Sequence, residues 1–442
     1  MARRRRVPLP APVEADIDSL AHDGRGVAHV EGKAVFIDGA LPGERVRFAY
    51  LRQHRSYDEG RTVDVLAAAP ERVEPRCPHF GVCGGCTLQH MAPPAQILAK
   101  QGILLENLTR IGDVRPQNVL EPLTGPHWGY RHKARLGAKF VVKKGRMLVG
   151  FRERHAPYVA ELTRCEVLHP SVGERIAALT ELLAGLSVRM RVPQVEVAVG
   201  DRITALVFRH LDPLTDADRS ALEAFGRTHD FAVYLQPGGP ASVELLYPQA
   251  AELTYGLPAH HVTLAFEPTD FIQINPAINR QMVDRVLELL ALRPEHQVLD
   301  LFCGLGNFTL PMARQAAGVV GVEGEAGLVR RAEQNAARNG IANARFYCAD
   351  LNEDLVDSPW LQRRYDRILL DPPRSGAAAM MARVAALEAP RIVYVSCHPG
   401  SLARDAGQLV HELGYRLVSA GVMDMFPHTA HVESIALFER PA

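Results

Sequence analysis

The chain has 442 residues, of which 47% are hydrophobic and 23% are charged, and its 50 basic side chains balance 50 acidic ones. This length allows two or three domains, this composition is that of a globular protein, and a net charge of zero indicates no particular partner. No apolar run approaches the roughly 20 residues that cross a bilayer, and no apolar stretch of a secretion signal follows the arginines of residues 1–6. We therefore expect a cytoplasmic protein without membrane contact, whose seven cysteines stay reduced.

Residues 1–70 contain short runs in which apolar and polar residues alternate, a pattern typical of half-buried strands. Glycines separate the five runs, which cover residues 14–20, 26–30, 33–37, 44–48 and 60–66. Five short strands in so small a segment predict an OB-like β-barrel.

Residues 71–92 contain three clustered cysteines, Cys77, Cys83 and Cys86, and Cys165 is the obvious remote fourth ligand. Four thiolates in a reducing compartment indicate zinc or an iron–sulfur cluster. Zinc sites usually place their cysteines in two CxxC pairs, whereas three clustered cysteines and a distant one are common for a 4Fe-4S cluster. The spacing favours the 4Fe-4S cluster, with zinc or unliganded core cysteines as the alternatives.

Residues 93–256 predict a central α+β domain, which begins with a helix over 94–111. Basic and aromatic side chains alternate between Trp128 and Arg154, and in the local sequence only Glu153 opposes them. Such a mixture suits phosphate contacts and base stacking, so we expect this surface to bind RNA. The expected RNA-binding residues are Trp128, Tyr130, Arg131, His132, Lys133, Arg135, Lys139, Lys143, Lys144, Arg146, Arg152 and Arg154.

Residues 257–442 alternate apolar runs with helical segments, which predicts a largely parallel sheet covered by helices on both faces. The last two strands are joined too closely for a parallel crossover and should form an antiparallel pair at one edge. The seven expected strands cover residues 298–302, 319–322, 344–348, 367–370, 391–395, 415–421 and 433–438.

A glycine-rich turn lies between the first two of these strands. The strand 298–302 leads into the turn 303–307, a helix over 308–317 follows, and the next strand ends at Glu323. This order is the nucleotide-binding βαβ arrangement, in which the final acid holds ribose hydroxyls. The glycines do not form the dinucleotide fingerprint. The arrangement of Asp300 at the end of the strand, just before the glycines, instead resembles the S-adenosylmethionine site of class I methyltransferases.

Polar residues follow the other strands of the predicted sheet as well. Ligands of such sheets bind outside the carboxyl ends of the strands, so these residues should converge on one crevice. They are Asp300 to Asn307, Glu323, Asp350, Asp371 to Arg374 and Ser396 to Pro399.

Asp371-Pro-Pro-Arg374 alone is ambiguous, because it is close to the loop with which methyltransferases of exocyclic amines bind a nitrogen. Cys397 at the end of the fifth strand changes the chemistry. A thiolate that adds to C6 of a pyrimidine makes C5 nucleophilic enough to take a methyl group. A base must then remove the C5 proton, and Glu433 is available. Considered singly, a buried cysteine and a surface glutamate would remain the ordinary interpretations.

These stretches together resemble the RNA uracil-C5 methyltransferase family over residues 257–442. The resemblance rests on Phe271 to Asn275, Leu299 to Phe308, Gly321 to Glu323, Asp371 to Arg374, Val395 to Cys397 and His428 to Glu433. It implies Cys397 as the nucleophile and Glu433 as the proton acceptor. It also implies contacts with S-adenosylmethionine or the target base from Gln273, Phe302, Asn307, Glu323, Asp350 and Asp371. His398 departs from the family, which usually has Asn there; as His can still donate a hydrogen bond, we expect activity to survive.

The first 92 residues add to this resemblance. The barrel resembles the TRAM domain, and the cysteine pattern is similar to the iron–sulfur site of the ribosomal branch of the family. Barrel and cysteines together imply the branch that methylates uridine 1939 of 23S ribosomal RNA, with a monomeric enzyme expected. Another ribosomal site or a tRNA remains the alternative substrate, and a catalytically idle RNA-binding protein is the alternative of a different class.

Overall fold

The structure, a computed structural model, describes residues 10–353, 355 and 358–441; the N-terminal arginines lie outside this range. The chain forms two compact units. The first contains the residues up to 100 together with 153–156 and 426–431, and the second contains 101–152, 157–425 and 432–442. Within the described ranges, no helix combines the length and apolar character that a bilayer span requires. The expected segment boundaries at residues 70, 92 and 256 stay predictions.

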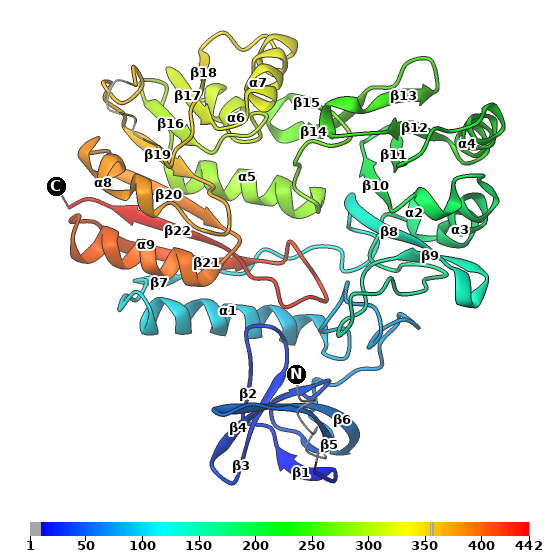
Figure 1. Ribbon diagram of the computed structural model, residues 1–442. Helices are drawn as coiled ribbons and strands as arrows, with labels where there is room; N and C mark the ends of the chain where they lie inside the picture. The colour runs from blue at the N-terminus through cyan, green and yellow to red at the C-terminus, as the bar shows by residue number, and fades with distance from the viewer. Residues whose placement is uncertain (1–9, 354, 356–357, 442) are drawn as a thin grey trace, which may run out of the picture. The chain divides into compact units, whose positions relative to one another are not determined.

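The first unit begins with a six-stranded sheet in the order β1-β5-β6-β4-β3-β2, the small barrel drawn in blue in Figure 1. Its interior is a cluster of buried apolar residues that includes Ile17, Ile37 and Phe48. The first expected run is divided into two strands, so that six strands replace the five expected. The strands are β1 (Val13–Asp16), β2 (Ser19–Leu20), β3 (Gly26–Val30), β4 (Lys33–Asp38), β5 (Arg45–Gln53) and β6 (Tyr57–Ala67).

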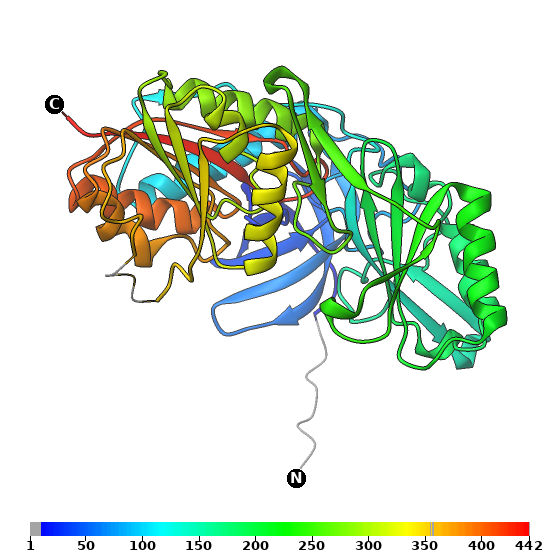
Figure 2. The ribbon, with the colours of Figure 1, turned by 90° about the horizontal axis from the view of Figure 1, so that it is seen from above.

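A second six-stranded sheet has the order β13-β12-β11-β10-β8-β9 and belongs to the second unit. The helices α3 and α4 pack against it, and Figure 2 shows the green helix α4 along one of its faces. The strands are β8 (Lys133–Val141), β9 (Arg146–Gly150), β10 (Gln194–Val199), β11 (Thr204–Arg209), β12 (Phe231–Gln236) and β13 (Glu244–Tyr247). The helices are α2 (Pro170–Gly173), α3 (Ile176–Gly185) and α4 (Asp216–His229), and a hairpin of β14 (Leu253–Leu257) and β15 (Val262–Phe266) follows.

The third sheet has eight strands in the order β18-β17-β16-β19-β20-β22-β21-β7. The strands are β16 (Gln297–Leu301), β17 (Gly318–Glu323), β18 (Ala344–Cys348), β19 (Arg367–Leu370), β20 (Arg391–Ser396), β21 (Arg416–Met423), β22 (Glu433–Glu439) and β7 (Asn118–Val119). The first five strands in this order are parallel, and β22 lies antiparallel between β20 and β21. The expected α/β fold is confirmed, including the antiparallel pair at one edge.

Strand order reverses between β16 and β19, and this reversal creates the ligand crevice of such sheets. Right-handed crossovers place α6 and α7 on one face of the sheet and α8 and α9 on the other. The helices are α1 (Pro93–Arg110), α5 (Pro276–Leu290), α6 (Thr309–Ala313), α7 (Ala326–Arg338), α8 (Ala378–Ala386) and α9 (Pro399–His411).

Two details differ from the sequence-based expectation. The helix expected over 308–317 is the five-residue α6, because the chain turns after Ala313 to enter β17 at Gly318 beside Gln297. The eighth strand, β7, comes from far outside the predicted domain and pairs with β21. An edge strand exposes unpaired backbone groups, and β7 covers part of that edge.

Candidate active site

The carboxyl ends of the parallel strands bring the predicted polar residues together. Leu301, the last residue of β16, pairs with Val322 of β17 on one side and with Leu370 of β19 on the other. Glu323 and Asp371, which follow these two partners, therefore flank the turn that begins at residue 302. The amide of Asp371 donates to the carbonyl oxygen of Leu301 at 3.3 Å, which fixes the start of the Asp371–Arg374 loop.

The glycine turn is built from left-handed backbone conformations. Phe302, Gly304 and Gly306 have φ angles of 66°, 55° and 97°, which glycine adopts without strain but phenylalanine does not. Phe302 keeps its conformation because its amide donates to the carbonyl oxygen of Val322 at 2.9 Å. These conformations make the chain turn tightly after β16, and the close approach of a ligand to this backbone stays a prediction.

Glu323 is held at both carboxylate oxygens by backbone amides. Gly304 donates to Oε2 at 3.0 Å, and Glu325 donates to Oε1 at 3.1 Å. Each carboxylate oxygen can accept a second hydrogen bond, so the side chain is fixed in place and still able to bind hydroxyl groups.

Asp300 is fully buried beneath the turn, and its carboxyl is only half satisfied. Thr309 donates to Oδ2 at 2.5 Å, whereas Oδ1 has no hydrogen-bond partner within the described part of the chain. Burial raises the pKa of Asp300 to about 8, and the nearby carboxylates of Asp371 and Glu323 raise it further in the same direction. Although Asp371 is partly exposed, desolvation of its carboxyl raises its pKa to about 7. Three acids thus share one poorly solvated site, in which burial favours the protonated, neutral form of Asp300 and Asp371.

Asn307 is tied to the scaffold rather than left open toward the crevice. Its side-chain amide exchanges two hydrogen bonds of 2.9 Å with that of Asn279 on α5, and Tyr255 donates to its Oδ1 at 3.0 Å. The other two expected contact residues lie outside this network. Gln273 is half-buried between β15 and α5, and Asp350 is exposed beyond β18, where it accepts from the amide of Asn352 at 2.9 Å.

Strand pairing brings the segments of Cys397 and Glu433 together. Ser396 pairs with Ser434 at the end of the β20–β22 ladder, and the Ser434 hydroxyl donates to the Ser396 carbonyl oxygen at 3.2 Å. Cys397 directly follows Ser396, and Glu433 directly precedes Ser434, so both residues adjoin the last pair of this ladder. Cys397 is half-buried and Glu433 is 7% exposed.

The Cys397 thiol is protonated in the protein alone. Burial raises the pKa of Cys397 to about 11, the carboxylates of Glu433 and Asp371 act in the same direction, and Arg374 acts against them. These influences show that all three charged groups lie near the sulfur. The thiol therefore needs additional positive charge or a proton acceptor before it can act as a nucleophile.

His398 caps helix α9 instead of donating from Nδ1. Its Nδ1 accepts a hydrogen bond of 3.1 Å from the amide of Ser401, which puts the ring proton on Nε2. Asn is a favoured helix cap for the same reason, since its side-chain oxygen accepts from this amide. His398 in place of Asn thus preserves the capping contact. The hydrogen bond that we expected this residue to donate can come only from Nε2.

The loop that contains Asp371 and Arg374 is fixed to α9 by buried polar contacts. Asp405 is fully buried and accepts from Tyr394 at 2.7 Å, from the amide of Ala377 at 2.8 Å and from Arg404 at 2.8 Å. This network could not be predicted from the sequence, because an Asp inside a helix has no characteristic motif.

A second anchoring network, within the first unit, holds the loop that precedes Glu433. Gln96 on α1 accepts from the amide of His428 at 2.8 Å, and its side-chain nitrogen lies 3.1 Å from His428 Nδ1. The amides of Thr87 and Leu88 both donate to the His428 carbonyl oxygen, at 2.8 and 2.9 Å. Lys100 donates to the carbonyl oxygen of Phe426 at 2.9 Å. The segment that directly follows Cys86 is thus bound to this loop.

The cysteine segment itself has little regular structure. Cys86 is 8% exposed, and the amide of Gly85 donates to Cys83 Sγ at 3.4 Å. Cys165 lies in the other unit, where its amide donates to Gly173. Over residues 10–353, 355 and 358–441, no group of three or more His, Cys, Asp or Glu side chains could surround a metal ion. The structure thus does not show the expected cluster.

The predicted basic surface is more neutral than its local sequence suggested. Lys133 forms a nearly buried ion pair of 3.1 Å with Glu196, and Arg146 pairs with Glu161 at 2.7 Å. In the first unit Arg154 pairs with Asp38 at 2.5 Å. Glu153 is the only acid in the local sequence, but the fold brings further acids to these cations from β4, from β10 and from the segment after β9. Exposed lysines remain at 139, 143 and 144.

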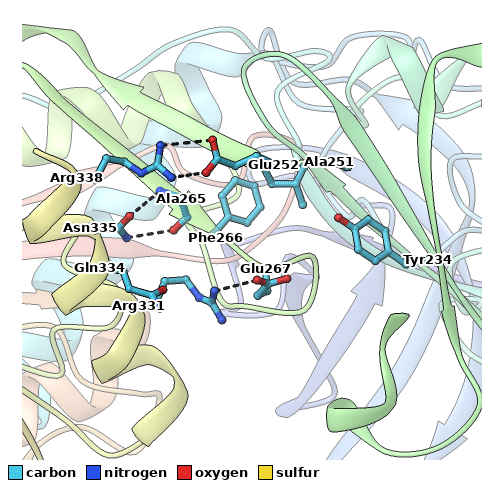
Figure 3. Close-up of a pocket in the computed structure, with 11 residues that line it drawn as sticks. Tyr234, Ala251, Glu252, Ala265, Phe266, Glu267, Arg331, Gln334, Asn335 and Arg338 are labelled. Carbon is cyan, nitrogen blue, oxygen red and sulfur yellow. Dashed lines mark hydrogen bonds and ion pairs between the residues drawn. The ribbon is translucent and has the colours of Figure 1, made fainter. Parts of the chain in front are cut away.

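In a cavity of about 520 Å³ between the β14–β15 hairpin and α7, the charged and polar lining side chains pair with one another or with the backbone (Figure 3). Arg331 pairs with Glu267 at 3.0 Å, Arg338 pairs with Glu252, and Asn335 exchanges hydrogen bonds of 2.8 and 3.1 Å with the backbone of Ala265. These contacts join the hairpin to the helix and leave no uncompensated charge for a ligand.

Comparisons with known proteins agree with this geometry. The sequence model of the family tRNA (Uracil-5-)-methyltransferase matches residues 257–441, and that of the TRAM domain matches residues 12–47. The chain is 58% identical over 441 residues to the 23S rRNA (uracil(1939)-C(5))-methyltransferase RlmD of Alkalilimnicola ehrlichii, covering 100% of this chain and 99% of that protein. It is 56% identical over 440 residues to the protein of the same name from Methylococcus capsulatus, covering 99% of both.

The solved structure of the Pyrococcus abyssi tRNA (uracil-54, C5)-methyltransferase with S-adenosyl-L-homocysteine shares the fold, with a TM-score of 0.74 at 24% identity. The match covers 96% of this chain and 100% of the Pyrococcus abyssi chain. The protein thus belongs to the RNA uracil-C5 methyltransferases, in the group of the 23S rRNA (uracil(1939)-C(5))-methyltransferases.

Proposed function

We propose that this protein methylates C5 of uridine 1939 in 23S ribosomal RNA, through a covalent bond between Cys397 and C6 of the base. The observation that supports the proposal is the end of the β20–β22 ladder, which Cys397 and Glu433 adjoin, together with the effect of Glu433 and Asp371 on the pKa of the Cys397 thiol. This reaction needs a nucleophile and a proton acceptor within reach of one base.

S-adenosylmethionine supplies a methyl group on a positively charged sulfur. The fit of the crevice to such a ligand rests on its three acids, since a cation among Asp300, Asp371 and Glu323 would offset the burial, and the smaller repulsion between the carboxylates, that raise the pKa of Asp300. Glu323, fixed by two amides, would hold ribose hydroxyls, and Phe302 would present the turn backbone. Asn307 would act by holding the turn. Gln273 and Asp350 stay proposed contacts.

The nucleophilic step begins when the Cys397 thiol gives its proton to solvent. Positive charge in the crevice lowers the pKa of the thiol, in the direction in which Arg374 already acts. The sulfur then adds to C6 of the uracil, and the electron pair of the C5–C6 double bond makes C5 the nucleophile that takes the methyl group, while the bond from that methyl group to the sulfonium sulfur breaks and S-adenosylhomocysteine is left.

Glu433 completes the reaction. Its carboxylate takes the proton from C5, the electrons of that C–H bond restore the C5–C6 double bond, and the C6–S bond breaks to release Cys397 as a thiolate. Glu433 is 7% exposed, so its carboxylate is largely shielded from water.

The target uridine has to leave its stack to reach this crevice, because C5 and C6 are covered in a helix. Phe271, two residues before Gln273, is 69% exposed, which is unusual for phenylalanine. We propose it as an aromatic surface on which an unstacked base lies. Phe271 belongs to the 271–275 stretch that carries the family resemblance.

The 4Fe-4S cluster on Cys77, Cys83, Cys86 and Cys165 remains part of the proposal. Each iron of such a cluster takes one thiolate, so its ligands need not surround a single ion. The chemistry of four thiols and the N–H···S contact from Gly85 to Cys83 support it. The chemistry of methyl transfer needs no electron, so the cluster would fold the segment or position the RNA. Iron and sulfide analysis of protein purified without oxygen tests it, with Cys86→Ser expected to lose the iron and its brown colour.

The reaction and its target are tested together by mapping 5-methyluridine in ribosomal RNA. A strain without this protein should lack the modification at position 1939, a copy of the gene should restore it, and a Cys397→Ala copy should not. Loss of 5-methyluridine from a tRNA or from another ribosomal position, with position 1939 unchanged, would favour the alternative substrates. Retained methylation in the Cys397→Ala strain would contradict the mechanism. Cytoplasmic location and the monomeric state stay predictions.

A further inference from the structure

The second unit contains a cavity of about 760 Å³ that has no part in the chemistry above. It is formed by the central six-stranded sheet and the N-terminal end of α5, and this volume is in the range that holds a nucleotide-sized ligand. The lining residues that matter below are Trp128, His132, His169, Arg175, Arg202 and Asn275.

Two uncharged imidazoles line the cavity. Burial lowers the pKa of His132 to about 4, and burial also lowers the pKa of His169, so both rings are neutral near pH 7. His132 Nδ1 lies 3.3 Å from the carbonyl oxygen of Val199 and must donate to it, which leaves Nε2 as an acceptor. His169 Nδ1 accepts from the amide of Ser171 at 3.3 Å, which puts its proton on Nε2. The pair therefore offers one acceptor and one donor.

Asn275 gives a second, independent sign of a ligand. The residue is fully buried at the N-cap of the 15-residue helix α5, and its Oδ1 accepts from the amide of Ile278 at 3.4 Å. Its Nδ2 has no partner among the residues that the structure describes. A buried donor without an acceptor costs free energy that a bound ligand oxygen would recover. The positive end of the helix dipole at the same place favours a phosphate.

The charges at the rim of the cavity fit a nucleotide better than a simple anion. Its cations and acids balance, so the cavity does not attract negative charge in general. Arg202 is exposed and has no ion pair in the described chain, whereas Arg280 forms an ion pair of 3.7 Å with Asp201. The charged rim residues are Arg175, Arg202, Arg280, Glu174, Asp201 and Asp230. One available arginine, an aromatic side chain and a donor–acceptor pair fit one phosphate and one base.

We propose that this cavity binds a single unstacked nucleotide of the substrate RNA, distinct from the uridine that is methylated. Its base lies against Trp128 and is contacted on its edge by His132 and His169, and its phosphate lies at Arg202 and the start of α5. This inference rests on the proposed function, because it takes the ligand to be part of the RNA that presents the target. Holding a neighbouring nucleotide out of the stack keeps the loop open around the target.

Tryptophan fluorescence tests the proposal directly, since the chain has two tryptophans and Trp360 is 1% exposed. In a Trp360→Phe protein the emission reports Trp128. A ribosomal RNA stem-loop that contains the target uridine should quench it saturably, with the midpoint at the Kd from a gel-shift titration. Unchanged emission at RNA concentrations that saturate the gel shift would overturn the proposal.

Matched variants give a second readout. Trp128→Ala should weaken RNA binding about 5- to 150-fold, as expected for one lost base stack, and Arg202→Gln should weaken it about 5-fold or more. Arg209→Gln, at the other end of β11, is the control and should bind as wild type. Equal binding by the Arg202 and Arg209 variants would count against the proposal. The covalent adduct with 5-fluorouridine RNA is measured in parallel. If the adduct forms but the Trp128 emission does not change, this inference is wrong and the proposed function stands. If the protein forms no adduct and binds no RNA, both the proposed function and this inference are wrong.

Discussion

The strand-end crevice and the central sheet differ in how their buried ionisable side chains are paired. In the crevice, Asp300, Asp371 and Glu323 lie close together with pKa values of Asp300 and Asp371 raised to about 8 and 7. In the central sheet, nearly buried Lys133 has Glu196 at 3.1 Å. Burying charge without a partner is costly, so a protein retains it where a ligand supplies the partner. Uncompensated acids therefore mark the binding site, and compensated cations mark the scaffold.

The largest effect is expected where the crevice does chemistry. Glu433→Gln should lower turnover about 10²- to 10⁴-fold, because the amide cannot take the C5 proton. The step before it should still occur, so the variant should accumulate a covalent complex with ordinary, unfluorinated RNA, visible on a denaturing gel. Loss of both turnover and complex, in a variant that binds RNA normally, would show that Glu433 acts before the methyl transfer.

A paired comparison of acids sharpens the contrast between scaffold and site. Glu196→Gln leaves the Lys133 charge buried without a partner and should lower the free energy of unfolding by about 3 kcal/mol. Asp371→Asn removes an acid from an overcrowded site, so the ligand-free protein should keep its stability while its affinity for S-adenosylmethionine falls. Thermal melts and calorimetric titration measure the two quantities. The reverse pattern would mean that the crevice acids are structural.

The same crowding predicts a pH dependence of stability. An acid whose pKa is raised on folding binds its proton more tightly in the folded state, so its contribution to stability is lost as pH rises through the folded pKa. Asp300 alone should thus lower the free energy of unfolding of the ligand-free protein by roughly 2 kcal/mol between pH 6 and 8. Asp300→Asn should flatten this slope, as chemical denaturation at several pH values would reveal. An equally steep slope in the variant would place the titration elsewhere.

The smallest effect is expected from the neutral hydrogen bonds that hold the loop before Glu433. Gln96→Ala removes the contacts to His428 and should slow release of the covalent complex about 10-fold, a barrier change near 1.4 kcal/mol. The control is Gln281→Ala, which loses a bond of 2.9 Å to the carbonyl oxygen of Thr124. Slower adduct formation instead of slower release would argue against a role through Glu433.

The sequence predicted those parts of the site that follow from topology. Parallel strands bring their ends together, so Glu323 and Asp371 could be placed from the order of strands alone. Cys397 and Glu433 needed in addition the chemistry of the pyrimidine and the family resemblance. The helix cap at His398 and the half-satisfied carboxyl of Asp300 depend on single hydrogen bonds, which no pattern encodes.

Several features that the sequence did not reveal depend on a partner from another part of the chain. Glu196 of β10 neutralises Lys133 on the paired strand β8, and Asn279 on α5 holds the side-chain amide of Asn307, whose contact with the ligand stays a prediction. β7 joins the sheet across about 300 residues of chain, from Asn118 to Ser419. Such contacts form only when the whole chain has folded, so local composition does not reveal them.

The account is tested most directly by the bond between Cys397 and the base. RNA with 5-fluorouridine at the target position, incubated with S-adenosylmethionine and the protein, should give a complex that survives denaturation, because fluorine at C5 prevents the final elimination. Peptide mass mapping should locate the RNA on Cys397, and Cys397→Ala should form no complex, whereas Cys348→Ala, which changes an exposed cysteine, should form it normally. A wild-type protein that methylates the unfluorinated RNA but forms no complex, or forms it at another residue, would contradict the account.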